Sequence, residues 1–353
     1  MPPAPSDAAD RLSVALDHVA RRGEAAGVER LCLGFDTLRL GLRVRTGSLL
    51  AELIDIFGRR DAVGTAPTAW LDIVEGPDPV LEACLPETAA DDERVVSATP
   101  RHYGFWDPAH GGKLVFVDRQ HRRGFVWHRS PETLPSWETA RPFLHAFKGL
   151  APFTGLTPLH AAAVAHGENG VLIAGRGGAG KTSLALACVE AGWRYVADDF
   201  LLLRGTPSLR AVNLYRSARI RADMFGHLQR TMAASFALST DSGEVKGEVD
   251  LGRLSACTIG DAEIGAIVVP HRAGAARAGW SPMRRSVVLR ELAATTLAML
   301  PGDAQATYDA IARGIEGVPC YAFDPGPTLS DAPAALAALA DSLGTGVPKA
   351  AEA

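Results

Sequence analysis

The alternation of apolar and polar residues predicts an α+β region in the first 150 residues. Strand-like residues starting near Arg30 (LCLGFDTLRLGLRVR) precede a helical stretch (SLLAELIDIFG), and 113–129 alternate around a polar turn as a β-hairpin does. A helix is expected over SWETARPFLHAFKGLAPFTG, ending near Gly149. We therefore expect an α+β domain over 28–150, preceded by a flexible tail at 1–27 that is rich in Ala, Pro and charge.

The pattern after residue 150 is typical of a nucleotide-binding sheet. Two apolar strands flank the turn signal 167–170, and a glycine-rich loop, an apolar helix (TSLALACVEAG) and a strand with two acids (WRYVADDFLLLR) follow. Strand, loop, helix and strand in this order form the βαβ unit of such sheets. We expect the α/β domain to span 151–335, with further strands in IGAIVVPHR and VPCYAF, a further helix in LRELAATTLAML, and a closing helix and tail at 336–353.

Composition and charge narrow the class of protein. Of the 353 residues, 47% are hydrophobic, enough to build folded domains, and the formal net charge of −4 gives no global positive field for nucleic-acid binding. No apolar stretch approaches the ~20 residues that span a bilayer, and the first residues lack the order of a signal peptide. We expect a cytoplasmic protein that binds neither nucleic acid nor membrane. The five cysteines form no C-x-x-C pair, which argues against disulfide and zinc frameworks.

A glycine-rich segment matches the phosphate-loop pattern G-x-x-x-x-G-K-[ST] between an apolar strand and an apolar helix. Its glycines let backbone N–H groups face phosphate oxygens, the helix adds the positive end of its dipole, and Lys181 reaches the β and γ phosphates. The hydroxyl of Thr182 is expected on Mg²⁺. The sequence therefore predicts binding of ATP and Mg²⁺. The residues expected to bind the nucleotide are Gly175, Arg176, Gly177, Gly178, Ala179, Gly180, Lys181, Thr182 and Ser183.

The same loop also contains the dinucleotide pattern G-x-G-x-x-G. Asp198 follows Gly175 by 23 residues, close to the ~20 expected for an acid that binds a ribose. A dehydrogenase is therefore an alternative. It leaves Lys181 and Thr182 unexplained, and it has no use for two adjacent acids.

Two acids and a histidine are further candidates for the chemistry. Asp198 and Asp199 close the strand WRYVADDF, where adjacent side chains point to opposite faces, so that one carboxylate can face a metal while the other is aimed differently. Paired acids among apolar residues are costly unless a metal or hydrogen bonds compensate them. His160 opens the neighbouring strand HAAAVAH. Taken alone, a histidine on an apolar strand is more often a core residue than a catalytic one.

His160, the loop GRGGAGKTS and the acids in YVADDF together resemble the catalytic core of the HPr kinase/phosphorylase family of bacterial serine kinases. That family has a histidine, a loop ending Gly-Lys-Ser and an Ala-Asp-Asp strand in this order, and the separations here look the same: 21 residues from His160 to Lys181 and 18 from Lys181 to Asp199. The resemblance covers about 155–205. It implies an α/β fold with an HPr kinase-like P-loop core, joined here to the α+β amino-terminal domain.

The resemblance also implies roles for these residues. Asp199 would be the base that accepts the proton of a serine hydroxyl, with His160 and Lys181 as catalytic partners; Thr182 would be a metal ligand, and Asp198 a catalytic acid on the metal side. The family's further metal-binding Glu lies in a Glu-Ile-Arg-Gly motif that is not intact here. The nearest stretch is GEVKGEVDLG, with Glu248 or Glu244 as the candidate ligand, and this departure leaves open whether reverse phosphorolysis occurs.

The first 150 residues do not resemble the family's usual amino-terminal domain. The arrangement looks more like HPr kinase-like proteins encoded beside ribosomally made, modified peptides. We therefore expect the acceptor to be a serine hydroxyl of a peptide or small protein that 28–150 recognise, and the sequence leaves a homo-oligomer open. A kinase of free serine or another small alcohol is one alternative, and a non-catalytic nucleotide-binding scaffold is another.

The hairpin at 113–129 carries basic residues interleaved with aromatic ones. Such a surface can hold an acidic partner or RNA, although a solvated hairpin turn is the favoured explanation. The residues concerned are Arg119, His121, Arg122, Arg123, Phe125, Trp127, His128 and Arg129.

Overall fold

The computed structural model describes residues 8–24, 27–45, 47–58, 66–85, 94–109, 111–221, 236–241, 244–253 and 257–344. The chain is mixed α/β and divides into two compact units. Unit 1 is Met1–Leu156 with Leu300–Ala304, and unit 2 is Thr157–Met299 with Gln305–Ala353. In the described part, no helix is both long and apolar enough to cross a membrane.

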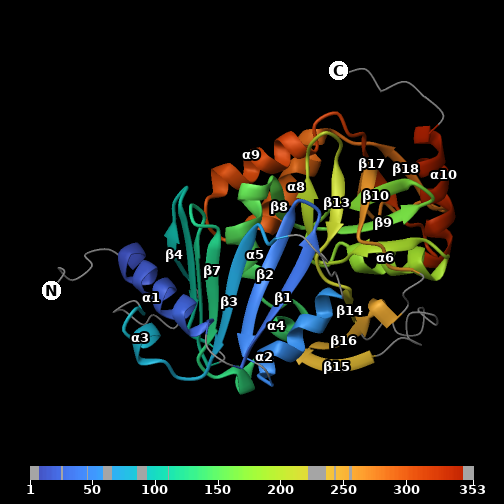
Figure 1. Ribbon diagram of the computed structural model, residues 1–353. Helices are drawn as coiled ribbons and strands as arrows, with labels where there is room; N and C mark the ends of the chain where they lie inside the picture. The colour runs from blue at the N-terminus through green and yellow to red at the C-terminus, as the bar shows by residue number, and fades with distance from the viewer. Residues whose placement is uncertain are drawn as a thin grey trace. The chain divides into compact units, whose positions relative to one another are not determined.

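Unit 1 is built on a seven-stranded mixed sheet with the strand order β1-β2-β3-β7-β6-β5-β4 (Figure 1). The predicted hairpin is present as β6 and β7, and the strand-like start of the domain forms a second hairpin, β1 and β2. The central strands are buried along nearly their whole length. The strands are β1 Val28–Phe35, β2 Leu38–Arg45, β3 Ala69–Glu75, β4 Arg94–Ala98, β5 His102–Asp107, β6 Lys113–Asp118 and β7 Arg123–His128.

The amino-terminal segment differs from the flexible tail that we expected. Residues Ala8–Arg22 form helix α1, whose apolar face (Leu12, Ala15, Leu16 and Val19) is buried in one core cluster with strand residues such as Trp127. These positions follow the i, i+3, i+4, i+7 spacing of an amphipathic helix, and burial of that face holds the helix on the sheet. Residues 1–7 of the expected tail lie outside the described part.

The second face of this sheet is covered by short helices: α2 Leu49–Glu52, the 3₁₀ turn Leu53–Phe57, α4 Ser136–Ala140 and α5 Leu144–Leu150. Phe35, Phe57 and Phe147 pack edge to face or tilted there. The single helix expected over SWETARPFLHAFKGL is broken, because Pro142 cannot continue α4 and Phe143 takes a left-handed conformation (φ 63°) before α5. The remaining short elements of the unit are α3 Pro79–Glu82 and the 3₁₀ turns Pro131–Thr133 and Ala151–Thr154.

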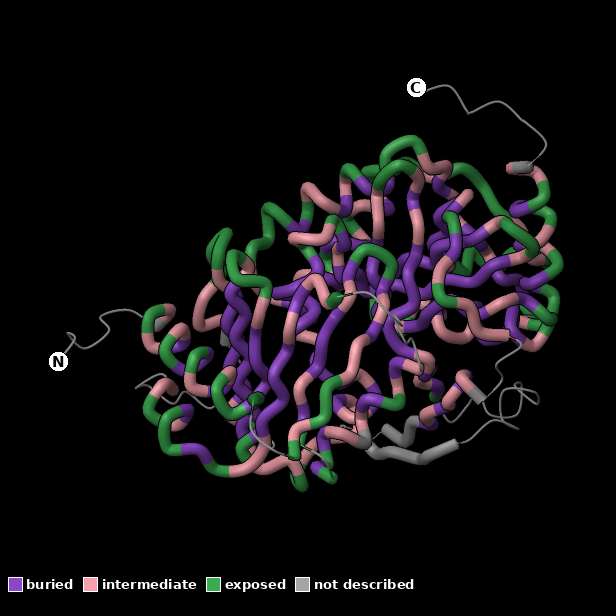
Figure 2. The backbone as a smooth tube through the Cα atoms, in the orientation of Figure 1, coloured by how far each residue is buried: buried purple, intermediate pink, exposed green. Residues whose placement is uncertain are grey.

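Unit 2 contains a nine-stranded mixed sheet between two helical layers. Its main path is β11-β9-β10-β17-β13-β12-β8, with β19 beside β17 and β18 beside β19. Alternate residues of β10 enter different core clusters: Leu172 packs in the cluster of α8 and α9, and Val171 in that of α6 and α10. Both faces of the sheet are therefore buried, which explains the near-continuous apolar strands (Figure 2).

The elements of unit 2 agree broadly with the apolar pattern of the sequence. The predicted final helix is α10, which begins within the expected kinase domain and packs in its core; residues 345–353 lie outside the described part. The strands are β8 Leu156–His160, β9 Ala162–His166, β10 Asn169–Ile173, β11 Arg194–Ala197, β12 Phe200–Arg204, β13 Arg210–Asn213, β17 Asp261–Pro270, β18 Gly279–Pro282 and β19 Cys320–Asp324. The helices are α6 Lys181–Glu190, α8 Arg285–Met299, α9 Ala304–Gly314 and α10 Ala332–Gly344.

Two sharp bends bring distant parts of this sheet together. The chain runs from β8 into β9 through Ala161, and from β11 into β12 through Asp198 and Asp199, although β8 and β11 stand at opposite ends of the strand order. The two bends are joined, because the Ala161 N–H donates to the Asp199 carbonyl at 3.1 Å. His160 and the acid pair therefore meet at one place.

A separate three-stranded sheet with the order β14-β16-β15 completes unit 2. It consists of β14 Ser217–Arg221, β15 Phe236–Asp241 and β16 Glu244–Asp250. Ala218, Ile220 and Val249 pack against Leu186 and Val189 of α6. This accounts for a helix that is apolar on all sides, because α6 packs on two separate groups of strands.

Candidate functional site

The glycine loop, residues 175–180, connects β10 to the first turn of α6. Ala174, just before it, donates its N–H to the carbonyl of Val268 on β17 at 2.8 Å and so fixes the start of the loop on the sheet. Gly178 and Gly180 have φ angles of 78° and 90°, in the left-handed region that residues with a Cβ rarely adopt. The strand, loop and helix thus follow one another as the motif predicts, and the glycines are required by the backbone.

Lys181, the first residue of α6, bends back over this loop. Its Nζ donates to the carbonyls of Gly175 at 2.8 Å and Arg176 at 3.2 Å, and the residue is only 5% exposed. Burial lowers the pKa of Lys181, whereas the nearby carboxylates of Asp199, Asp198 and Glu291 raise it. The ammonium is thus held by neutral carbonyls in the field of three acids.

Thr182 and Asp198 form a hydrogen-bonded pair in the candidate site. The Thr182 hydroxyl lies 2.9 and 3.0 Å from the two carboxylate oxygens of Asp198, which is buried. A hydroxyl and a carboxylate are the oxygen donors that Mg²⁺ accepts in nucleotide sites, so this pair fits the predicted cation. Within the described ranges, no group of three or more His, Cys, Asp and Glu side chains is arranged to hold a metal.

Glu248, the third residue predicted for the metal, lies in the separate three-stranded sheet. It is on β16, where its register partners are Arg219 and Ala237. The side chain of Glu244 lies outside the described part. The assignment of either residue to a metal site stays a prediction.

Asp199 and His160 face each other at the two strand bends. The His160 Nε2 lies 3.5 Å from Asp199 Oδ1. The Asp199 side chain is 24% exposed, against 2% for the whole of Asp198, so the two acids differ in their access to solvent. The His160 ring also packs against Phe200, and its backbone N–H donates to the Thr296 hydroxyl at 3.0 Å.

The expectation that the acid pair closes one continuous strand is wrong. Strand β11 ends at Ala197, β12 begins at Phe200, and Asp199 has a φ of 62°. A residue in this left-handed conformation breaks the alternation of a strand, so the rule that neighbours point to opposite faces does not apply here. The bend lets Asp198 contact Thr182 while Asp199 faces His160.

Sequence reasoning missed two residues of α8 that contact this site. Glu291 Oε2 lies 3.4 Å from Arg176 Nε, and Thr296 binds the backbone of His160. The available signal was a lone acid within the apolar run LRELAATTLAML. Nothing local distinguishes such an acid from a residue on a solvated helix face.

The hairpin of β6 and β7 does not offer aromatic side chains to a ligand. Phe125 and Trp127 are fully buried, because they alternate into the core next to α1. The less favoured alternative, a surface of interleaved basic and aromatic side chains, is therefore excluded for these two aromatic residues.

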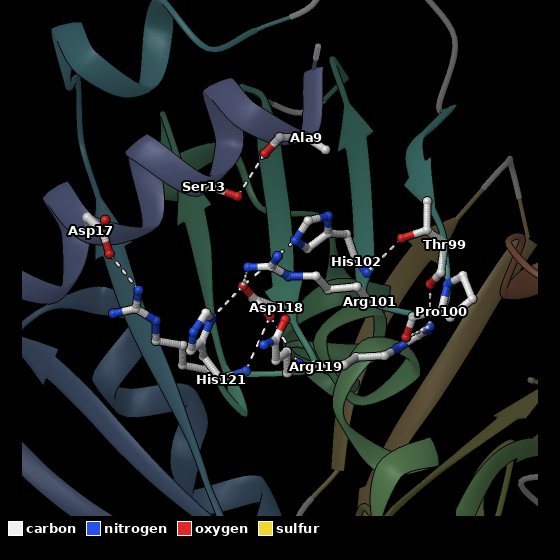
Figure 3. A network of polar contacts seen from close by, with 12 residues as sticks. Ala9, Ser13, Asp17, Thr99, Pro100, Arg101, His102, Asp118, Arg119 and His121 are labelled. Carbon is white, nitrogen blue, oxygen red and sulfur yellow. Dashed lines mark hydrogen bonds and ion pairs between the residues drawn. The ribbon is translucent and has the colours of Figure 1, made fainter. Parts of the chain in front are cut away.

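The basic residues at the turn of this hairpin hold neighbouring segments together (Figure 3). Buried Asp118 accepts hydrogen bonds from Arg101 at 3.0 Å and His121 at 2.8 Å. Burial favours a higher pKa, but these hydrogen bonds outweigh it and hold the pKa of Asp118 well below its usual range. Arg119 donates to the carbonyls of Thr99 at 2.8 Å and Gly149 at 3.0 Å. The network joins the β4–β5 turn, the β6–β7 turn and α5.

Comparison with known proteins finds similarity among solved structures and none among families or curated proteins. No family model and no curated protein matches the chain. The Hpr(Ser) kinase/phosphatase from Coxiella burnetii is similar over 53% of this chain and 99% of its own, with 15% sequence identity and a TM-score of 0.28. The arrangement of the site, not this likeness, supports the function considered below.

Proposed function

We propose that the protein is an ATP-dependent kinase that transfers the γ-phosphoryl group to a serine hydroxyl of a peptide or small protein. The observation that carries this proposal is the convergence of five side chains on one place: Lys181 bound to the glycine loop, the Thr182–Asp198 pair, and Asp199 beside His160. The order and spacing of these residues also resemble those of the HPr kinase/phosphorylase family.

Different residues of the site are proposed to bind the phosphates and the metal ion. Lys181 leaves the loop carbonyls to bind the β and γ phosphates, and the loop N–H groups bind the rest of the phosphate chain. Thr182 and Asp198 hold Mg²⁺, which neutralises charge on the phosphate oxygens when it is bound. Most of the catalytic effect then comes from positioning and charge, not from covalent chemistry.

Asp199 is the proposed base, and His160 its partner. The serine oxygen forms a bond to the γ phosphorus, the bond from that phosphorus to the β–γ bridging oxygen breaks, and ADP leaves with the electron pair. Asp199, the more exposed of the two acids, accepts the hydroxyl proton. Base assistance of this kind contributes roughly 10²- to 10⁴-fold to the rate. His160, 3.5 Å from Asp199, holds that carboxylate in place.

The test is phosphate transfer measured by mass spectrometry. Full-length protein is incubated with ATP, Mg²⁺ and either serine-containing peptides, including any encoded beside its gene, or free serine. We expect a peptide to gain one phosphate on serine and free serine to remain unmodified. Efficient phosphorylation of free serine alone would favour the small-molecule alternative, and ATP binding without any transfer would favour the scaffold.

Calorimetry separates the kinase from the dehydrogenase alternative. We expect binding of ATP with Mg²⁺ and none of NAD, because Lys181 and Thr182 follow the glycine loop. Binding of NAD without ATP would contradict the proposal.

We further propose that unit 1 recognises the acceptor, since a metabolite kinase has little need of this second unit. Truncation is a poor test, because Leu300–Ala304 also belongs to unit 1 and the Tyr103 hydroxyl donates to the Pro301 carbonyl. Hydrogen exchange on the full chain, with and without a peptide that it phosphorylates, is expected to show protection within 28–150. Protection confined to unit 2 would contradict acceptor recognition by unit 1.

A further inference from the structure

Arg176 and Glu291 form an ion pair at the edge of the glycine loop. Arg176 is the second residue of the loop motif, its side chain is 70% exposed, and its Nε lies 3.4 Å from Glu291 Oε2. A guanidinium has five N–H donors in a fixed fork, so a contact through Nε leaves other donors for an anion. The ion pair thus holds the Arg176 guanidinium at the loop, and the N–H donors other than Nε can still bind an anion.

Glu291 is not an ordinary surface acid. Its side chain is only 15% exposed, and its helix neighbours Val288 and Leu292 are fully buried against the sheet. Burying a carboxylate to this extent costs free energy of folding unless a nearby cation compensates its charge. Arg176, 115 residues earlier in the chain, is the cation that contacts it.

The same helix supports the opposite side of the site. Thr296, five residues after Glu291, accepts the backbone N–H of His160. Glu291 also lies close enough to Lys181 to raise the pKa of that lysine against the effect of burial. Helix α8 is therefore a common support for the loop and for the histidine.

We propose that Glu291 is a positioning residue of the nucleotide site, which holds the Arg176 guanidinium where its remaining donors bind a phosphate of the nucleotide. The proposal rests on the proposed function only in requiring a polyphosphate ligand. A purely structural Glu291 would leave binding unchanged once the protein is folded. An acid that mainly repelled phosphate would have the opposite effect, because its removal would tighten binding.

The experiment is calorimetry on the full chain with two probes, ATP with Mg²⁺ and inorganic tripolyphosphate. Arg176→Ala should weaken binding of both by roughly tenfold, the usual effect of losing one charge-assisted hydrogen bond. Glu291→Gln removes the charge at constant size and should weaken binding about fivefold. The double variant should bind no more weakly than Arg176→Ala, because Glu291 acts through Arg176. An effect of Glu291 on binding that does not act through Arg176 would instead persist in the Arg176→Ala background.

Glu316→Gln is the matched control, since it makes the same chemical change at an exposed position after α9 and should leave binding unchanged. Unchanged or tighter binding by Glu291→Gln, or losses that add in the double variant, would overturn the positioning role alone. A wild-type protein that binds neither probe overturns this role and the proposed function together. Polyphosphate binding that depends on Glu291, without transfer to any serine, overturns the proposed function and leaves the positioning role standing.

Discussion

Two lysines of this protein are equally buried but differ in what surrounds them. Lys113 of unit 1 and Lys181 of unit 2 are each 5% exposed. The Lys113 Nζ lies 2.6 Å from a carboxylate oxygen of Glu138, and over the rings of Phe105 and Trp137 at 5.7 and 5.2 Å from their centroids. Lys181 is bound to two loop carbonyls.

The difference separates a structural lysine from one suited to bind a ligand. The charge of Lys113 is neutralised by a partner that the fold supplies, and aromatic faces complete its surroundings. Carbonyl oxygens carry only partial charges, so they satisfy the hydrogen bonds of Lys181 without cancelling its charge. An incoming phosphate can replace them at little cost. Burial of a lysine is therefore no guide to its role until its partners are known.

The largest expected effect is on activity, in Lys181→Met. Loss of the cation should reduce serine phosphorylation by about 10³-fold, the effect of removing a group that stabilises charge in the transition state. The thermal midpoint should change little, because the hydrogen bonds that Lys181 loses are to the neutral carbonyls of Gly175 and Arg176. Phosphate transfer and thermal unfolding are measured together. Retained activity would show that the loop is only a turn.

The matched substitution Lys113→Met should have the opposite profile. It leaves Glu138 buried without its cation, which costs about 3 kcal/mol of the free energy of unfolding. Denaturant unfolding measures this loss, and ATP binding by the folded variant should be unchanged. The double variant Lys113→Met with Glu138→Leu should recover most of the stability. If Lys113→Met is as stable as the wild type, the contrast between the two lysines does not hold.

Asp199→Asn, at the more exposed acid of the candidate site, should have a smaller effect on activity than Lys181→Met. The amide keeps the size of the side chain but cannot take a proton, so transfer should fall by roughly 10²-fold or more while ATP affinity changes little. Rates and calorimetric affinities are compared with those of the wild type. A large loss of affinity with normal turnover would instead assign Asp199 to nucleotide binding.

The smallest expected effect is a dependence of stability on pH that arises from His128, the register partner of Lys113 on the next strand. Burial lowers the pKa of His128 to about 4, although Glu138 opposes the shift. The unfolded chain has the ordinary value near 6.5, so between about pH 4 and 6.5 it binds more protons than the folded chain, and acid reduces stability. Relative to His128→Gln, the wild type should lose roughly 2 kcal/mol over this range. Denaturant unfolding at several pH values measures the difference, and parallel curves for the two proteins would contradict it.

Local patterns predicted the elements that depend on nearby residues. The glycine loop between an apolar strand and an apolar helix, and the hairpin of β6 and β7, follow from signals a few residues apart. Helix α1 carried the right spacing in Leu12, Ala15, Leu16 and Val19, but its Ala- and Pro-rich surroundings favoured a tail. The strand residues that bury the apolar face of α1, such as Phe116 and Trp127, come much later in the chain.

The parts of the site that were not predicted depend on contacts between distant residues. The acids in WRYVADDFLLLR sit in an apolar run that reads as one strand, and no periodicity reveals a residue with positive φ. The contact of Glu291 with Arg176 joins residues that are far apart in the sequence, so no local pattern predicts it. Motif spacing predicted the residues of the candidate site, whereas the bend at Asp199 and the contacts of helix α8 are seen only in the structure.

The left-handed backbone of Asp199 also restricts which amino acids position 199 accepts. At φ 62° only Gly, Asn and Asp are tolerated with little strain. Asparagine is reached from aspartate by one nucleotide change, and it preserves the bend while removing the proposed base. On the proposed mechanism, this one substitution therefore leaves nucleotide binding largely intact and slows transfer by roughly 10²-fold or more. On that mechanism, the backbone at this position leaves only a short evolutionary step between a protein that transfers phosphate and one that mainly binds nucleotide.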